Sequence, residues 1–344
     1  MRVAVVAGDD AAPEVVWPAI EVAEAAGARL EWAAVDAGDV AGAKAIIDGS
    51  ASTLFGAASK RSLPLLMHLR WGLQTFANVR PARYLSGARS PLARPDGIDF
   101  VIVRENIEDL YCGVEGDLAE LAPLRRRDRG DRLIDAAAGA YAIKAITRQR
   151  TADVSRVAFR HARERAASRG RPGQVAVGTK HNVLPRSDGL FLDVVTEVAA
   201  DFPDVPLRSY LADDLARLVV AAPQELDVVL LPNLYGDVIS DVAAGVIGGL
   251  GMAPSGCYGH GYAYFEAVHG TAPDLAGSGS INPTAQFLST AMLLEHVGET
   301  AAAARLVAAI ETVYASGRTL TRDQGGTATT REFTGAVIGA LAAS

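Results

Sequence analysis

The chain of 344 residues is poor in cysteine and contains no long uninterrupted apolar run. Its two cysteines, Cys112 and Cys257, have no paired spacing, which argues against a disulfide framework and against a thiolate zinc site. The opening segment Met1–Gly8 is too short for a secretory signal and lacks a cleavage site. No apolar run approaches the roughly 20 residues that a membrane helix needs. We therefore expect a cytoplasmic protein that neither crosses nor leaves a membrane.

Positive charge is also in the minority. The chain has 33 Lys and Arg against 40 Asp and Glu, a formal net charge of −7, and a calculated pI near 5.4. This balance argues against a nucleic-acid binder, whose surface is usually basic.

Neither a Gly-x-Gly-x-x-Gly sequence nor a Walker-type sequence is present, so a Rossmann dinucleotide site is not supported. A small acidic substrate would need locally placed arginines instead.

What the sequence does contain is an alternation of short apolar runs with longer segments of helical spacing. Residues 2–7 form an apolar run that ends at Gly8, and Pro13–Ala26 follows with the spacing of a helix. Such alternation is typical of α/β architecture. Further strands are predicted at Phe100–Arg104, Gln174–Gly178 and Asp227–Leu231.

Two other segments have simple interpretations. The alanine-rich Thr300–Ser316 suits a surface helix that stops at Gly317. The basic, turn-rich run Leu121–Gly130 is interpreted as a solvent-exposed loop rather than an anion-binding site, because charge runs usually face water.

The most informative segment is Asn233–Asp241, which carries the carboxylates of Asp237 and Asp241 four residues apart. In a helix this spacing places both on one face, where they can share a hard divalent cation. A second segment, His269–Asp274, has the composition of a ligand-binding loop. Taken alone, these patterns predict a metal site but name no reaction.

Three arginines are candidates for binding a carboxylate, since guanidinium presents a fixed fork of donors. Arg70 and Arg80 lie ten residues apart, and Arg104 closes a predicted strand, where α/β proteins often bind ligands. Tyr111 and Lys180 are a titratable pair able to move protons, provided that burial or a nearby cation tunes the lysine.

As a set, these residues resemble the β-decarboxylating dehydrogenases, the family of isocitrate and 3-isopropylmalate dehydrogenases that also includes homoisocitrate and tartrate enzymes. The sequences of Asn233–Asp241 and Phe265–His269 are most similar to those of the NAD-dependent isocitrate branch. The segments that carry the resemblance are Gly8–Asp9, Pro13–Val15, Ala77–Pro81, Val103–Asn106, Lys180, Asn233–Asp241, the Asp274 loop, Asn282–Thr284 and Asp323–Thr327.

The resemblance implies roles for the site residues. Arg70, Arg80 and Arg104 would grip the carboxylates of a malate, Tyr111 would protonate the enolate carbon, and Lys180 would be the base in the partner subunit's site. The implied metal is Mg²⁺ or Mn²⁺, and its ligands would be Asp237 and Asp241 together with Asp213 from the partner. The last assignment depends on register, because Asp214 or Ala212 would occupy the position if the match shifted by one residue.

The resemblance also implies a cofactor site without a Rossmann motif. An acidic residue at Asp274 would accept hydrogen bonds from the adenosine ribose and repel a 2′-phosphate, which favours NAD over NADP. Glu266 and Asn182 would lie near the nicotinamide, and Asn282 near the adenine. The implied cofactor residues are Asn182, Glu266, His269, Gly270, Ala272, Asp274 and Asn282.

The fold implied is that of isopropylmalate dehydrogenase, with two α/β domains sharing a large mixed sheet. The larger, cofactor-binding domain would be discontinuous and comprise residues 1–76 and 248–344. Residues 77–247 would form the smaller domain, with the dimerisation surface and the metal and substrate residues. We expect a homodimer with shared active sites and no nucleic-acid partner.

Two departures from the family pattern concern the substrate. The opening loop Gly8–Val15 has Asp10 and Ala12 where glycines are usual, and these residues adopt positive φ less readily. The segment between Gly56 and Arg70 is shorter than usual.

Within that segment, Leu66 and Met67 match the apolar pair of isopropylmalate enzymes and predict an alkyl γ-group. Lys60, Arg61 and His68 leave open an anionic one, as in isocitrate, homoisocitrate or a phosphonate-bearing malate; tartrate and malate are further alternatives.

Two rival functions remain at this point. A non-catalytic regulatory subunit usually lacks the catalytic tyrosine, lysine or metal aspartates, and all are present here. A metal-dependent hydrolase could use Asp237 and Asp241, but it would leave the three arginines and Asp274 unexplained.

Overall fold

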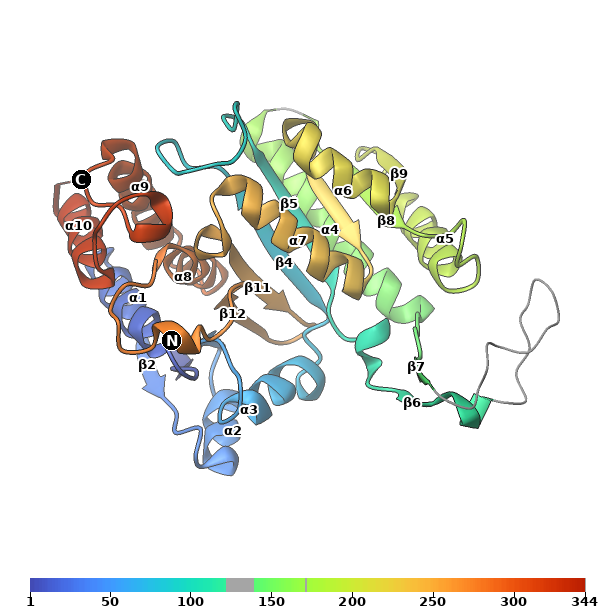
Figure 1. Cartoon of the computed structure of the whole chain (residues 1–344), viewed down its shortest axis with the longest axis horizontal. Coiled ribbons are helices and arrows are strands. Elements are labelled where there is room, and N and C mark those ends of the chain that lie inside the picture. The colour runs from blue at the N-terminus through green and yellow to red at the C-terminus, as the bar shows by residue number, and fades with distance from the viewer. Residues whose placement is uncertain (122–138, 171, 344) are drawn as a thin grey trace.

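A mixed sheet of ten strands runs through the molecule in the computed structural model, which describes residues 1–121, 139–170 and 172–343 (Figure 1). From edge to edge its strands are β2 (Glu31–Ala34), β1 (Arg2–Val6), β3 (Ser52–Phe55), β12 (Ala263–Ala267), β11 (Pro254–Tyr258), β4 (Ala77–Arg83), β5 (Asp99–Glu105), β10 (Val228–Leu231), β8 (Val175–Thr179) and β9 (Leu207–Leu211).

The strands pair in parallel toward both edges and antiparallel at the centre, where β12, β11, β4 and β5 meet. The edge pairings are those of βαβ units, and nearly continuous apolar strands such as Val3–Val6 and Val228–Leu231 are buried on both faces, as parallel sheets require. Residues from the two ends of the sequence therefore meet the middle of the chain in one sheet.

The described residues form ten α-helices around the sheet, some of which pack on other helices. In Figure 1, α6 and α7 lie over the half of the sheet that contains β5, β10 and β8, while α1, α8, α9 and α10 gather at the other end. The helices are α1 (Pro13–Ala25), α2 (Val40–Asp48), α3 (Leu63–Met67), α4 (Arg148–Arg169), α5 (Ser187–Ala199), α6 (Ala212–Ala221), α7 (Asn233–Ile247), α8 (Thr284–His296), α9 (Thr300–Ser316) and α10 (Thr330–Ala343).

A small two-stranded arm of β6 (Glu115–Asp117) and β7 (Ala140–Ala142) projects from the body of the molecule (Figure 1). The predicted loop at Leu121–Gly130 falls, from residue 122 onward, outside the described residues. Within the described residues, no helix is both long and apolar enough to span a membrane.

The strand and helix predictions are confirmed at the expected places. Each of the four predicted strands is present, and the helix after the opening strand begins at Pro13. The helix Thr300–Ser316 ends at Gly317, whose φ of 62° is the left-handed conformation that glycine adopts readily. The division at residues 76 and 247 stays a prediction.

Charged residues tie α4 to the sheet in a partly buried cluster. The carboxylate of Asp227, which precedes β10, accepts hydrogen bonds from Arg165 Nε at 2.9 Å and Arg169 Nη1 at 3.0 Å. Its other oxygen accepts from the backbone N–H of Gln174 at 3.0 Å. Both arginines also reach Asp99 at the start of β5, so this cluster fixes α4 across two neighbouring strands.

Replacing Asp227 with Ala is therefore expected to lower the free energy of unfolding by about 3 kcal/mol, because two partly buried guanidinium groups lose a carboxylate. Chemical denaturation checks this value. Asp204→Ala is the matched control, since Asp204 pairs with Arg163 on the exposed surface and should change stability little. Equal effects of the two substitutions would contradict the role of the cluster.

Candidate active site

The two carboxylates predicted to share one helix face lie on α7, which begins immediately after β10. Asp237 is half-buried and Asp241 is exposed, one turn further along. Burial and the neighbouring charge of Asp237 raise the pKa of Asp241 above its usual value. Gly236 permits a close contact in this first turn, because a Cβ at that position would come within 2.6 Å of the Arg104 side chain.

Arg104 lies at the end of β5 with 2% of its side chain exposed. Its Nε and Nη2 donate to Asn233 Oδ1 at 3.0 and 2.6 Å, and its Nη1 pairs with Asp237. Burial and the nearby Arg80 lower the pKa of Arg104 to about 10, so it stays charged at neutral pH. A buried arginine thus fixes the first turn of α7 to the sheet.

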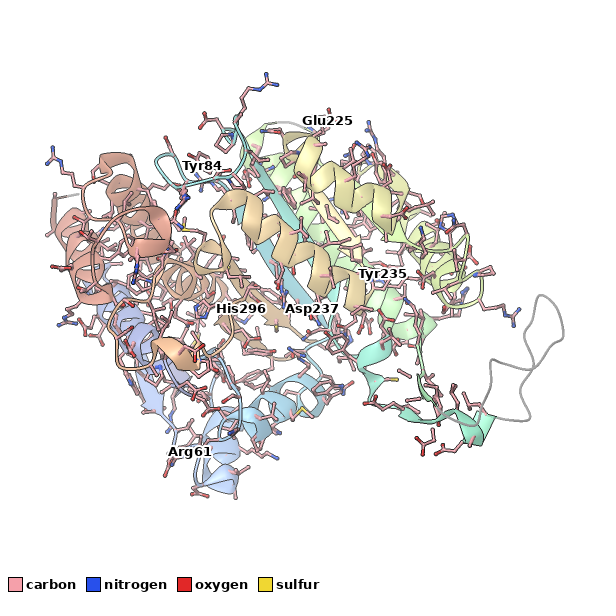
Figure 2. All side chains as sticks on the ribbon, in the orientation of Figure 1. Arg61, Tyr84, Glu225, Tyr235, Asp237 and His296 are labelled. Carbon is pink, nitrogen blue, oxygen red and sulfur yellow. The ribbon has the colours of Figure 1, made fainter. Side chains whose placement is uncertain are left out.

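Asp237 also receives two further donors. Arg80, on β4, donates through Nη1 to Asp237 Oδ1 at 3.2 Å and to Ser240 Oγ at 2.6 Å. The phenol of Tyr111 donates to Asp237 Oδ2 at 2.7 Å. Burial alone would raise the pKa of Asp237, but Arg104, Tyr111 and Arg80 hold it below its usual value. Figure 2 shows Asp237 near the centre of the molecule, where these elements converge.

Tyr111 keeps its proton in this setting. Burial, followed by the hydrogen bond to Asp237, raises the pKa of the phenol, and the two nearby arginines only partly oppose this. Its ring also lies 5.2 Å from the Arg104 guanidinium carbon, a cation–π distance. The site therefore presents a protonated phenol beside a carboxylate and two arginines.

Arg70 reaches the same region from a π-helical turn, His68–Gly72, that continues α3. The N–H of Leu73 bonds to His68 O and that of Thr75 to Arg70 O, the i to i+5 pattern of such turns. Burial alone would lower the pKa of Arg70, but Tyr264 and Glu266 raise it above the ordinary arginine value. Arg70 and Arg80 each have a buried Nε with no hydrogen-bond partner among the described residues.

Lys180 and Asp213 form a separate pair. The Lys180 ammonium contacts Asp213 Oδ1, and within the described residues no ion pair joins either of them to the Asp237 cluster. Moreover, no group of three His, Cys, Asp or Glu in the described part of the chain is placed to hold a metal ion. One subunit thus supplies two neighbouring carboxylates, and the roles of Lys180 and Asp213 stay predictions.

Most of the predicted cofactor residues lie on β12 or in the loop that follows it. His269 Nδ1 lies 2.9 Å from Gly270 O, while its buried Nε2 has no partner among the described residues. Ala272 has a φ of 46°, unusual for a residue with a side chain, and Asp274 is exposed in the short helix Pro273–Leu275. The role of this loop in binding a cofactor stays a prediction.

The two predicted asparagines differ in their surroundings. Asn182 is exposed in the turn after β8. Asn282 is buried, and its side chain is engaged within the protein: its nitrogen donates to Asp323 at 2.9 Å and its oxygen accepts from Thr284 N at 3.0 Å. The structure thus gives the Asn282 side chain an internal bonding role that the sequence did not predict.

Comparison with known proteins agrees with this geometry. Residues 2–337 match the isocitrate/isopropylmalate dehydrogenase family. The chain belongs to that family. It is 43% identical over 297 residues to the isocitrate/homoisocitrate dehydrogenase of Thermus thermophilus, covering 84% of this chain and 80% of that one. The 3-isopropylmalate/3-methylmalate dehydrogenase of Methanocaldococcus jannaschii is 38% identical over 342 residues, with 96% of both chains covered.

A solved structure gives the same result for the fold. The crystal structure of isocitrate dehydrogenase from Methylococcus capsulatus superposes with a TM-score of 0.86 at 32% identity and covers 99% of both chains. The family resemblance and the fold class predicted from the sequence are therefore confirmed.

This member of the isocitrate/isopropylmalate dehydrogenase family adapts its opening loop to the missing glycines. Asp10 adopts a φ of 52°, which aspartate tolerates, whereas Ala12 has a φ of −58° and is unstrained. Of positions 10 and 12, only position 10 therefore has a backbone conformation that favours glycine.

Asp9 links this loop to the shortened segment after Gly56. Its Oδ2 accepts from the backbone N–H groups of Ser59, Lys60 and Ser62 at 2.8, 3.0 and 3.1 Å, and its Oδ1 accepts from Ser62 Oγ. Partial burial alone would raise the pKa of Asp9, but these donors hold it below its usual value. One carboxylate thus determines the path of the short segment.

The charged candidates near the γ-group mostly have other partners. His68 Nε2 lies 2.6 Å from Asp48, and Arg61 pairs with Asp36 at 2.7 Å. Figure 2 shows Arg61 at the edge of the molecule, away from Asp237. Met67 remains 49% exposed, and Lys60 is exposed as well. Arg61 and His68 are thus engaged with carboxylates of this chain, and recognition of an anionic γ-group by either of them stays a prediction.

Sequence reasoning assigned no role to several residues that shape this site. Asn233 and Ser240 lie inside the segment that carried the family resemblance, yet their contacts with Arg104 and Arg80 are visible only in the fold. The partly buried Lys144 and the buried Asp188 had no recognisable sequence signal.

Asp9→Ala should release the segment at residues 59–62, because three backbone donors lose their acceptor. Hydrogen exchange at the amides of Ser59, Lys60 and Ser62 should accelerate. Asp10→Asn is the control, because among the described residues the Asp10 carboxylate accepts from Ser59 Oγ alone, and it should leave Lys60 and Ser62 protected. The pKa of Asp9 is lower in the folded state than in the unfolded state. The stabilisation that Asp9 provides is therefore present above its unfolded-state pKa and is lost as pH falls through its folded-state pKa. Unchanged exchange in Asp9→Ala would contradict this assignment.

Proposed function

We propose that the chain catalyses NAD-dependent and Mg²⁺- or Mn²⁺-dependent oxidative decarboxylation of a 3-substituted malate to a 2-oxo acid and CO₂. The observation that carries this proposal is the convergence of Arg80, Arg104 and Tyr111 on Asp237, one of two carboxylates on the same face of α7. A cluster of guanidinium groups beside a carboxylate that can bind a hard cation suits a hydroxy-dicarboxylic acid.

The arginines supply recognition of the substrate carboxylates. Arg70 and Arg80 carry buried Nε donors that lack partners among the described residues, and such donors favour an anionic ligand that accepts from them. Arg104 is already bonded to Asn233 and Asp237, so its contribution is mainly a fixed positive charge. Removal of water from around these arginines would strengthen each of these interactions.

Asp237 and Asp241 are the proposed metal ligands in this subunit. Their carboxylate oxygens, one helical turn apart, are the donors that Mg²⁺ and Mn²⁺ prefer, and the partner's site would gain Asp213 in the same way. When bound, the cation supplies Lewis-acid polarisation of the substrate's C2 oxygen, which favours departure of the β-carboxylate as CO₂.

Two side chains would carry the protons. Lys180 would accept the proton of the 2-hydroxyl as hydride leaves C2, and the arginines of the partner's site would favour the neutral amine that a base requires. Tyr111 would then protonate C3 after CO₂ departs. The raised pKa of Tyr111 supports this role, since the phenol holds a proton at neutral pH and can donate it.

The proposed hydride acceptor is NAD, held by the loop His269–Asp274 and by Glu266, Asn182 and Asn282. Asp274 is exposed and would accept from a ribose diol while repelling a 2′-phosphate. A relative from Caenorhabditis elegans, named a probable NAD isocitrate dehydrogenase subunit alpha, is 39% identical over 274 residues, which supports this choice.

For the γ-group we propose an alkyl substituent, so that the substrate is similar to 3-isopropylmalate. Leu66 packs against the core around β1 and β3, while Met67 leaves an apolar surface exposed. The Methanocaldococcus jannaschii relative, named a 3-isopropylmalate/3-methylmalate dehydrogenase, supports this substrate. The alternative is an anionic γ-group: Lys60 is exposed and has no carboxylate partner within the described residues, and the Thermus thermophilus relative is named for isocitrate and homoisocitrate.

A homodimer with shared sites is part of the proposal. On α7, Val238 and Val242 are 59% and 36% exposed one turn apart, an apolar stripe suited to a partner helix. Lys180 and Asp213 lie outside the Asp237 cluster of their own subunit, as expected if they serve the partner's site. Both cysteines are unpaired, which supports the proposed cytoplasmic setting.

The proposal is tested by following NADH formation with Mg²⁺ and a panel of alkylmalates, isocitrate, homoisocitrate, tartrate, malate and phosphonate-bearing malates. We expect the native chain to show its highest kcat/KM with an alkylmalate and NAD. The Lys180→Met variant should remain folded but form no NADH. Preference for NADP would contradict the role of Asp274. Absence of reduced cofactor from the whole panel would reject the catalytic proposal and favour a regulatory subunit, whereas Mg²⁺-dependent hydrolysis without NAD would favour a hydrolase.

Sharing of the sites is tested with hybrid dimers. Tyr111→Phe and Lys180→Met chains should each be nearly inactive alone. Mixing, unfolding and refolding them together should restore about a quarter of native activity, because half of the dimers are hybrids and each hybrid keeps one site with both groups intact. If Tyr111 and Lys180 act in the same subunit's site, the mixture stays inactive.

A further inference from the structure

A buried ion cluster lies between the segments that carry the proposed acid and base. Asp109 and Asp188 are both fully buried, and the ammonium of Lys144 sits between them at 3.1 and 2.8 Å. The Lys144 side chain is 13% exposed, and its ammonium lies 4.4 Å from the centre of the Tyr235 ring. We call these three charged residues the Lys144 bridge.

The second oxygen of each carboxylate in the bridge binds a backbone N–H. Asp188 Oδ2 accepts from the N–H of Lys180 at 2.6 Å. Asp109 Oδ2 accepts from the N–H of Leu234, in the first turn of α7, at 2.9 Å. The bridge thus connects the backbone of the proposed base to the helix that carries Asp237, through five groups in a row.

The bridge also holds an unusual backbone conformation next to the proposed acid. Asp109 has a φ of 67° and a ψ of −141°, which is unfavourable for a residue with a side chain. Its N–H donates to Ala145 O at 2.8 Å, beside Lys144, and this pairing helps to fix the turn. Tyr111 follows two residues later in the turn Leu110–Cys112, so the path at Asp109 determines where the phenol emerges.

Charge makes Lys144 indispensable to this arrangement. Two buried carboxylates close to one cation are tolerated only because that cation pairs with both. Tyr235 covers the ammonium and restricts its access to water. Without Lys144 the carboxylates would repel each other or take up water, and the two backbone N–H contacts would be lost with them.

We propose that Lys144 is a positioning residue: its ammonium, held between Asp109 and Asp188, keeps the Tyr111 turn and the Lys180 backbone in the arrangement that proton transfer requires. This inference rests on the proposed function. Lys144 itself has no assigned contact with substrate or cofactor. Its effect is expected in turnover rather than in substrate binding, because the three arginines, and not Lys144, are proposed to bind the substrate.

The kinetic test compares Lys144→Met and Lys144→Arg with the native full-length protein. We expect Lys144→Met to lower kcat on the order of 100-fold while the KM values change less than about threefold, as misplacement of reacting groups would do. Lys144→Arg keeps the charge and should recover part of kcat. Arg148→Met, which removes an exposed partner of Glu197, is the control and should be near native. A kcat for Lys144→Met within about threefold of native would overturn the proposal.

A measurement without turnover separates this inference from the proposed function. Hydrogen exchange at the amides of Lys180 and Leu234 should accelerate in Lys144→Met while exchange in β10 stays native. If Lys144→Met does not fold, Asp188→Asn replaces it in this test. Asp188→Asn weakens the bridge and at the same time removes a buried charge. Hydrogen exchange at the Lys180 amide should still accelerate in that variant. Native protection at both amides would overturn the proposed bridge, whereas faster exchange in a protein with no activity on any hydroxy acid would reject only the proposed function.

Discussion

The organisation of the site depends on the interaction of Asp237 with the guanidinium of Arg104. Arg104 is almost fully buried, and a charge removed from water to that degree is tolerated only with a partner and satisfied donors. Asp237 supplies the opposite charge and Asn233 the remaining acceptor. Because Asp237 also binds Arg80 and Tyr111, the same carboxylate brings β4, β5 and α7 together.

This constraint explains why the backbone nearby is specialised. The contact between Arg104 and α7 requires that position 236 carry no side chain, since a Cβ there would overlap Arg104. Near the same cluster, the π-helical turn at His68–Gly72 adds a residue to one helical turn. Arg70 lies within this turn, where it is close enough to Tyr264 and Glu266 for both to raise its pKa.

Local patterns in the sequence predict the elements of this fold well and its contacts poorly. Properties of neighbouring residues predict the helical face shared by Asp237 and Asp241, the apolar strands and the helix that ends at Gly317. The structure confirms each of these elements. The pairing of Arg104 with Asn233 joins residues 129 positions apart and depends on the order of strands in the sheet. The π-helical turn at His68 has no comparable local signal.

The Lys144 bridge shows why such charged contacts escape sequence reasoning even when the family is recognised. Lysine and aspartate are usually exposed, so the sequence predicts that Lys144 and Asp188 lie on the surface. Asp188 lies in the first turn of α5, and it meets Lys144, and through it Asp109, only in the folded chain. The carboxylates can remain there because backbone N–H groups and one ammonium satisfy them together. A charged residue thus becomes part of the interior when several chain segments each provide one contact that it needs.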